Sequence, residues 1–193
     1  ACCIRGTINA GTKFNDIVLV VGAGPIGLMH IQLAKIAGAR KVLVSEPNAF
    51  RRQKALEVGA TCVINPTSED LASIVKAETN GLGVDVIILA IGIPAIVNES
   101  IKLCKKNGTL CLFAGFAGTG ACTIEANLIH YNELHVCGSS AYTRNDYHTA
   151  AQLVCDGKIN LEAIATHEYH IEDFQAAYDM CKSGVGLKVL IKP

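Results

Sequence analysis

Three glycines with a spacing that could bind phosphate lie in the stretch VLVVGAGPIGLMH, residues 18–30. Gly22, Gly24 and Gly27 form the pattern G-x-G-x-x-G directly after the most β-prone segment of the chain. Between a strand and a helix, this pattern is the dinucleotide-binding fingerprint. Gly22 would allow a tight turn, Gly24 would let a pyrophosphate approach the backbone, and Gly27 would let helix and strand pack closely. The alternative is that the glycines form a tight turn and nothing more.

The helix predicted after the glycines supplies the charge that an anion needs. Pro25 falls in its first turn, where the missing N–H of proline costs little, and Ile26 follows it. The remaining free N–H groups and the positive end of the helix dipole would hold a pyrophosphate without any lysine. We therefore predict that Gly22, Gly24, Pro25, Ile26 and Gly27 bind a cofactor.

An acidic residue stands where the fingerprint expects one, about 20 positions further on. Glu46 lies 19 residues beyond Gly27 and ends the apolar run KVLVSE, residues 41–46. A carboxylate there can accept both ribose hydroxyls of adenosine and would repel a 2′-phosphate, since like charges ~4 Å apart cost roughly 1–4 kcal/mol. The pattern favours NAD over NADP. Arg51 and Arg52 could reach a 2′-phosphate, but we expect one to lie along the adenine and the other to be solvated.

The elements that must position these residues alternate regularly along the chain. Short apolar runs without polar alternation are typical of strands in a parallel sheet that is covered on both faces. Strands are predicted at residues 16–21, 41–46, 61–66, 83–92, 108–115 and 132–139, and helices at 25–39, 48–60, 68–79, 94–106 and 144–158. Two βαβαβ halves of this kind form the doubly wound α/β Rossmann fold, a six-stranded parallel sheet of order 3-2-1-4-5-6.

The two ends of the chain add to this core. Residues 1–11 read as the last turns of a helix, and residues 165–193 read as a strand, a helix and a final strand. We expect residues 1–160 to form the nucleotide-binding domain and 161–193 to be a C-terminal strand-helix-strand appendage that belongs with a neighbouring domain. The chain does not begin with methionine and reads as a piece of something longer.

Composition excludes several classes of function. Lys plus Arg and Asp plus Glu number 17 each, without a basic stripe, so neither nucleic acid nor a membrane surface is an expected partner. The longest uncharged apolar stretches, near residues 17–29 and 86–97, are too short to cross a bilayer. Nine scattered cysteines without a C-x-x-C pattern favour buried free thiols in a reducing cytoplasm over a disulfide framework or a zinc site.

One further segment invites a metal interpretation. His167-Glu168-Tyr169-His170 is H-E-x-H, not the helical H-E-x-x-H, and its two histidines would point to opposite faces of a strand. We expect an ordinary half-exposed strand there. No serine-nucleophile elbow or Walker motif occurs.

Six segments together resemble the coenzyme-binding half of the zinc-dependent medium-chain alcohol and polyol dehydrogenases, in particular sorbitol- and threonine-dehydrogenase-like members. They are GTKFNDIVLVVGAGPIGL, FRRQKALEVGAT, GVDVIILAIGIP, NGTLCLFAG, CGSSAYTRNDY and GLKVLIKP. The resemblance implies that Arg51 lies beside the adenosine of NAD and that the nicotinamide half lies against the ends of the later strands. The matching positions there are Ile91, Gly92, Ala114, Gly115, Phe116, Ser140 and Ala141.

The resemblance also implies what lies outside this chain. In the family, the other half carries the catalytic zinc and the proton relay, so we predict no catalytic residue and no metal ligand here. The intact enzyme would pass a hydride between a small alcohol or polyol and NAD, with zinc polarising the substrate oxygen, and this chain alone would be inactive. Family members pair through their coenzyme domains near the sixth strand, which implies a homo-oligomer, with the stretch 115–129 as a candidate contact.

Other interpretations remain open at this point. A zinc-free, quinone-reductase-like enzyme shares the fold, although its loop usually runs A-x-G-G-V-G where this chain has G-A-G-P-I-G. An isolated NAD-binding module without catalysis would need the same glycine loop. A methyltransferase is disfavoured by the third glycine and by the two-half rhythm of strands.

Overall fold

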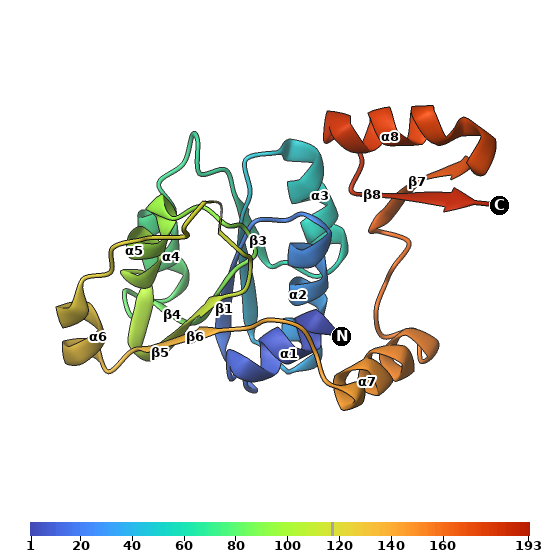
Figure 1. Cartoon of the computed structure of the whole chain (residues 1–193). Helices are drawn as coiled ribbons and strands as arrows, with labels where there is room; N and C mark the ends of the chain where they lie inside the picture. The colour runs from blue at the N-terminus through green and yellow to red at the C-terminus, as the bar shows by residue number, and fades with distance from the viewer. Residues whose placement is uncertain (117) are drawn as a thin grey trace.

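A six-stranded parallel sheet forms the centre of the molecule (Figure 1). This computed structural model describes residues 1–116 and 118–193. The strand order is β3-β2-β1-β4-β5-β6, which confirms the predicted doubly wound topology. The strands are β1 (Ile17–Val21), β2 (Lys41–Ser45), β3 (Cys62–Ile64), β4 (Val84–Leu89), β5 (Cys104–Leu112) and β6 (His135–Gly138).

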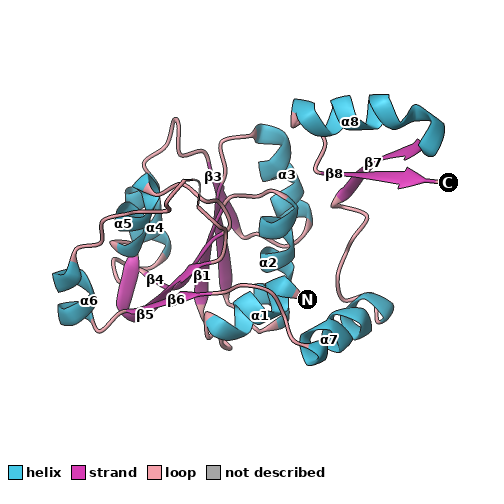
Figure 2. Ribbon diagram, viewed as in Figure 1, coloured by secondary structure: helices cyan, strands magenta, loops and turns pink. Residues whose placement is uncertain are grey.

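Alternate residues of each strand enter two separate cores, one on each face of the sheet. Val18 and Val20 of β1 pack with α2 (Pro25–Ile36) and α3 (Ala49–Glu57), whereas Leu19 packs with α4 (Leu71–Glu78) and α5 (Ala95–Ile101). Figure 2 shows these helices in two layers with the strands between them. Because both faces are covered, all five residues of β1 are buried and the strand shows no polar alternation.

Local sequence signals fix where several helices begin. Asn48 precedes α3 and its side chain accepts a hydrogen bond from the Arg51 N–H, and Pro25 occupies the first turn of α2. Thr143 and Asp146 form a reciprocal capping box at the start of α7 (Arg144–Cys155). These starts lie within a few residues of the predicted ones.

The prediction of a helix over 94–106 is wrong at its C-terminal end. Helix α5 stops at Ile101, and β5 begins at Cys104, which pairs with Val84 of β4. The register shifts between Val84 and Val86, and Lys105 forms an ion pair with Asp85 at this irregularity. Cross-strand pairing therefore overrides the helical periodicity.

A short helix, α6 (Ala126–Asn132), begins within the stretch 115–129 that we expect to contact a second copy of the chain. Part of the predicted contact stretch 115–129 lies outside the described residues, since it includes residue 117. Within the described part of the chain, no helix is long and apolar enough to cross a membrane.

The C-terminal segment forms its own small sheet beside α3 (Figure 1). Strands β7 (Ala165–His170) and β8 (Lys188–Lys192) pair in parallel and are linked by a 3-10 turn (Ile171–Asp173) and α8 (Phe174–Ser183). The predicted strand-helix-strand appendage is therefore confirmed. Gln32 of α2 exchanges hydrogen bonds with the backbone of Asn160, at 3.2 and 2.6 Å, which ties the start of this segment to the main core. The domain division at residue 160 stays a prediction.

Candidate cofactor site

The glycine loop joins β1 to α2 and closes so tightly that two of its glycines cannot be replaced. Gly22 has a φ of +96°, and a Cβ added there would lie 2.5 Å from the Ile91 side chain. A Cβ added at Gly27 would collide with the backbone oxygen of Gly22. These contacts are the tight turn and the close packing of helix and strand that the sequence predicted.

Gly24 differs from the other two glycines because it faces open space. It is the N-cap of α2, with φ −68° and ψ −176°, and a Cβ added there would meet no atom within 4 Å. No side chain caps this helix, and the N–H groups of its first turn have no partner within the helix. An anion can therefore approach the backbone at Gly24.

Glu46 follows β2 and is nearly buried, with 4% of its surface exposed. Its Oε2 accepts a hydrogen bond from the Ala23 N–H at 2.8 Å, and its Oε1 accepts one from the Asn48 N–H at 2.9 Å. The carboxylate thus joins the glycine loop to the start of α3. Since a carboxylate has about four acceptor positions, two remain for ligand hydroxyls.

The two arginines of α3 have different partners. The Arg52 guanidinium donates to the carbonyl oxygens of Glu46, at 2.9 Å, and Pro47, at 2.7 Å. Arg51 reaches the carbonyl oxygen of Gly184 at 3.3 Å while lining the cavity beside Glu46. Both side chains bind backbone carbonyls and are half-buried, and the expectation that one lies along the adenine and the other is solvated stays a prediction.

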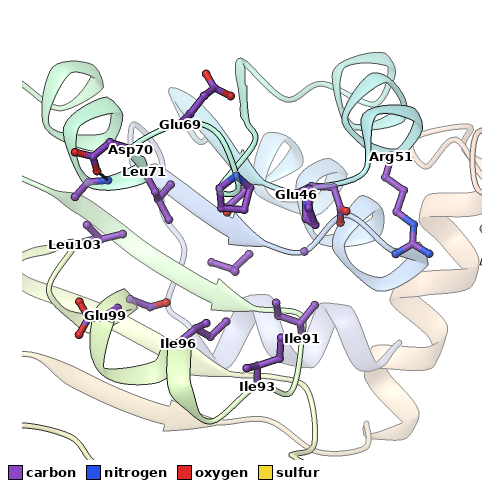
Figure 3. Close-up of a pocket in the computed structure, with 17 residues that line it drawn as sticks. Glu46, Arg51, Glu69, Asp70, Leu71, Ile91, Ile93, Ile96, Glu99 and Leu103 are labelled. Atoms are coloured by element: carbon purple, nitrogen blue, oxygen red, sulfur yellow. Dashed lines mark hydrogen bonds between the residues drawn. The ribbon is translucent and has the colours of Figure 1, made fainter.

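A cavity of about 670 Å³ opens between the carboxyl ends of β1, β2 and β4 (Figure 3). In an open doubly wound sheet, ligands bind at the carboxyl ends of the strands, where the strand order reverses. Four residues predicted to bind a cofactor line it, namely Gly22, Glu46, Arg51 and Ile91, and it also has apolar and acidic residues that sequence reasoning missed. The missed apolar residues are Leu71, Ile93, Ile96 and Leu103, which form a wall with Ile91, and the missed rim comprises Glu69, Asp70 and Glu99.

The missed residues carry no motif. Ile93 and Ile96 follow β4, and Leu71 begins α4, so only their position after a strand or at a helix start could have indicated them. Asp70 caps α4. Its pKa is lowered mainly by a hydrogen bond from the Ser73 hydroxyl and to a smaller extent by one from the Ser73 N–H. Asp70 therefore has a structural role at the rim.

A second cavity, of about 500 Å³, lies at the carboxyl ends of β5 and β6. Four of the predicted nicotinamide-side residues line it, together with neighbours that were not predicted. The predicted ones are Ala114, Gly115, Phe116 and Ser140, and the others are Leu112, Phe113, Gly138 and Ser139. The Ser139 hydroxyl is buried and has no hydrogen-bond partner among the described residues.

Gly92 lies between residues of the two cavities, since its neighbours Ile91 and Ile93 line the first and Gly115 lines the second. A Cβ added at Gly92 would collide with the backbone oxygen of Gly115, so the segments after β4 and β5 lie in direct contact there. The remaining predicted residues lie beside the cavities and not in their walls: Gly24, Pro25, Ile26, Gly27 and Ala141. Of these, Ile26 is 38% exposed, and Ala141 has a φ of +60°.

Metal-binding side chains do not gather anywhere in the described part of the chain. No three His, Cys, Asp or Glu residues come close enough to hold an ion among residues 1–116 and 118–193. His167 and His170 lie on β7, where His167 Nδ1 is 3.0 Å from the Thr166 hydroxyl and His170 Nδ1 accepts from the Glu172 N–H at 3.4 Å. All nine cysteines are free thiols, but the expectation that they are mostly buried is wrong, since only Cys3 and Cys111 are buried and three others are exposed.

Comparison with known proteins places this arrangement in a family. The family model described as zinc-binding dehydrogenase matches residues 25–156, which is more than half of the chain and includes all residues that line the two cavities except Val21 and Gly22. The chain belongs to the zinc-binding dehydrogenase family.

Individual members of this family match nearly the whole chain. An L-threonine 3-dehydrogenase of Pyrococcus furiosus is 36% identical over 186 residues, covering 95% of this chain and 53% of the relative. A sorbitol dehydrogenase of Halalkalibacterium halodurans is 32% identical, covering 100% of this chain and 56% of the relative. A zinc-binding dehydrogenase of Sinorhizobium meliloti 1021, solved with NADP bound, superimposes with a TM-score of 0.91 at 31% identity, covering 100% of this chain and 56% of that one.

The chain thus spans about half the length of these zinc-binding dehydrogenases. It corresponds to their C-terminal half, which confirms the resemblance seen in the sequence. The relatives are oxidoreductases, and the one with the bound nucleotide holds NADP.

Proposed function

We propose that this chain binds NAD(H) as the coenzyme-binding half of a zinc-dependent alcohol or polyol dehydrogenase. The observation that supports it best is the pairing of Gly24 with Glu46. Gly24 leaves open space at an uncapped helix N-terminus, and Glu46, bonded to the neighbouring Ala23 N–H, lines the adjoining cavity. The helix N-terminus at Gly24 suits a pyrophosphate, and the Glu46 carboxylate suits ribose hydroxyls.

Each part of the dinucleotide has a complementary surface. The first turn of α2 would donate N–H groups to the pyrophosphate, and the isoleucines after β4 would cover the adenine. The free acceptor positions of Glu46 would bind the adenosine ribose, with Arg51 at the open edge. The second cavity, beyond Gly92, would receive the nicotinamide.

In this proposal the chemistry belongs to the cofactor and to residues outside this chain. Bound NAD supplies a hydride acceptor at the nicotinamide. The residues of this chain orient that ring and hold the rest of the dinucleotide, whereas the zinc of the family and the alcohol or polyol are held elsewhere. We therefore expect the chain alone to bind cofactor without turnover. We also propose that the protein is cytoplasmic and forms a homo-oligomer that pairs through this domain.

The test is titration of NADH and NADPH into the purified chain, followed by cofactor fluorescence and calorimetry. We expect NADH to bind more tightly, because the Glu46 carboxylate would repel a 2′-phosphate. Glu46→Gln should raise the NADH Kd about tenfold, since it removes the charge and weakens the hydrogen bonds that order the site. Glu57→Gln, on the exposed side of the neighbouring helix, is the matched control.

Three results would contradict the proposal. The absence of binding by either nucleotide would mean that the glycines only make a turn. Tighter binding of NADPH would overturn the choice of NAD. Equal effects of the two glutamate substitutions would remove Glu46 from the ribose site.

A further inference from the structure

The first helix, α1 (Cys2–Asn9), presents two polar side chains to the same neighbouring loop. Arg5 and Asn9 stand at positions i and i+4, which lie on one face of a helix. Figure 1 shows α1 beside the path of the chain from β6 to α7. Nothing in the sequence motifs connects these two residues with the cofactor.

Arg5 holds the C-terminal end of this loop through an ion pair across 141 positions of the chain. Its Nε and Nη2 donate to the two carboxylate oxygens of Asp146, each at 2.9 Å, and Nη2 also lies 3.3 Å from the Thr143 hydroxyl. The Asp146 side chain is 1% exposed and accepts the Thr143 N–H at 2.7 Å. Two-point contacts of this kind fix orientation as well as distance.

Asn9 holds the other end of the same loop. Its side-chain amide donates to the carbonyl oxygen of Gly138, the last residue of β6, at 3.3 Å, and its own carbonyl accepts from the Cys137 thiol at 3.5 Å. Only residues 139–142 lie between the two anchored ends. We call these four residues the β6–α7 loop.

The β6–α7 loop borders the second cavity. Ser139 and Ser140 line it, and Ala141 keeps a left-handed backbone, φ +60°, that an alanine adopts at an energetic cost. Such a conformation persists only where the surroundings hold it. The anchors at the two ends of the loop, both supplied by α1, can do so together with the Ser139 N–H, which donates to the Leu112 carbonyl oxygen at 3.3 Å.

We propose that Arg5 is a positioning residue for the nicotinamide end of the cofactor and acts through the β6–α7 loop. Asn9 holds the other end of the same loop. This inference rests on the proposed NAD(H) site and adds to it a residue far from the glycine loop. The adenosine end of the site is built on β1, β2 and β4, and no residue of α1 lines it. Its affinity for the adenosine part of the cofactor should therefore not depend on Arg5.

The experiment compares two ligands on the same variants. ADP-ribose contains the adenosine, pyrophosphate and second ribose but no nicotinamide, whereas NADH has all of these parts. Calorimetric titration of both into the unsubstituted chain, Arg5→Gln, Arg5→Lys and Arg40→Gln separates the two ends of the site. Arg40 is an exposed arginine outside both cavities and serves as the matched control.

We expect Arg5→Gln to raise the NADH Kd about tenfold and to leave the ADP-ribose Kd within about twofold. Arg5→Lys should recover part of the NADH affinity, because it keeps the charge but loses the two-point geometry. Unchanged ADP-ribose binding also shows that the variant is folded. Arg40→Gln should change neither Kd.

Equal losses for both ligands would reduce Arg5 to a general structural role and overturn the inference, as would unchanged NADH binding in Arg5→Gln. If neither ligand binds the unsubstituted chain, the proposed function fails and this inference fails with it. The two failures are distinguishable, because failure of the proposed function is seen with the unsubstituted chain, whereas failure of the inference about Arg5 is seen only in the variants.

Discussion

The glycine loop shows how residues of one type can serve different purposes within six positions. Gly27 packs against the backbone of Gly22, so its missing Cβ is a requirement of the fold. Gly24 has an ordinary φ and open space around its Cα. The protein itself therefore leaves room for a Cβ at Gly24, and under the proposed function it is the bound pyrophosphate that requires its absence.

This difference predicts opposite outcomes for the same substitution. Gly24→Ala should cost at most about 1 kcal/mol of stability, because alanine is a poorer N-cap than glycine, yet it should raise the NADH Kd at least about tenfold. Gly27→Ala should prevent stable folding, since its Cβ would overlap the Gly22 carbonyl. Urea denaturation and NADH titration of the two variants measure both effects. A Gly24→Ala variant that binds NADH normally would show that no phosphate approaches there.

Glu46 has a structural as well as a proposed binding role. It was predicted from its distance to the glycines, and the structure places it in the cavity wall. The sequence gives no sign that both of its oxygens already accept backbone N–H groups, from Ala23 and Asn48. The acid thus aligns the glycine loop with the start of α3 before any ligand binds.

At the scale of elements, α3 depends on its cap to hold its first turn beside the cavity. The Asn48 side chain accepts the Arg51 N–H at 3.1 Å, and Arg51 lines the cavity from that turn. The cap therefore sets the position of a predicted cofactor residue as well as the start of the helix.

Asn48→Ala should lower the free energy of unfolding by about 1 kcal/mol, because a donor at the helix start loses its partner. Gln53→Ala, at an exposed position within the same helix, should be neutral or slightly stabilising, since alanine has the higher helix propensity. Urea denaturation of both variants gives the comparison. Equal free energies of unfolding for the two variants would show that the Asn48 side chain does not stabilise the start of α3.

The elements also show where periodicity misleads. Residues 104–106 continue the helical pattern of α5, yet Cys104 pairs with Val84 and Lys105 with the Asp85 carboxylate, so the segment joins β5. The backbone hydrogen bonds of a neighbouring strand decide the outcome there, and a local pattern contains no information about them.

For the whole molecule, a buried histidine links stability to pH. His30 of α2 is fully buried, its Nε2 has no hydrogen-bond partner among the described residues, and its ring meets Phe113 edge-on at 4.4 Å. Burial lowers the pKa of His30 from 6.5 to about 4. The contact joins α2 to the residue that follows β5, beneath Gly6 of α1, so protonation there opposes the global fold.

The direction of the pH effect follows from this shift. Between pH 6.5 and about 4 the unfolded chain binds a proton that the folded chain does not, so stability is complete above pH 6.5 and falls as the pH decreases. The loss is at most about 3 kcal/mol for this group. His30→Leu should flatten the pH dependence of the free energy of unfolding over that interval. Identical slopes for the variant and the unsubstituted chain would contradict the assignment.

The sequence by itself determined the parts of this protein that local patterns encode. The alternation of apolar runs with helical periods gave the order of the elements, and the handedness and connection rules left one sheet order, which the structure confirms. The glycine spacing and Glu46 located the cavity in which we propose that the adenosine binds. These signals are short-range, because each depends on residues within about one βαβ unit.

Only the tertiary structure decided which distant residues complete the site. The apolar wall joins Leu71 of α4 to Ile93 after β4, and Arg5 meets Asp146 across most of the chain. Such contacts arise from how helices pack on the sheet and on one another, and no spacing along the chain specifies them. The sequence therefore located the carboxyl edge of the sheet as the site, and packing selected the side chains that surround it.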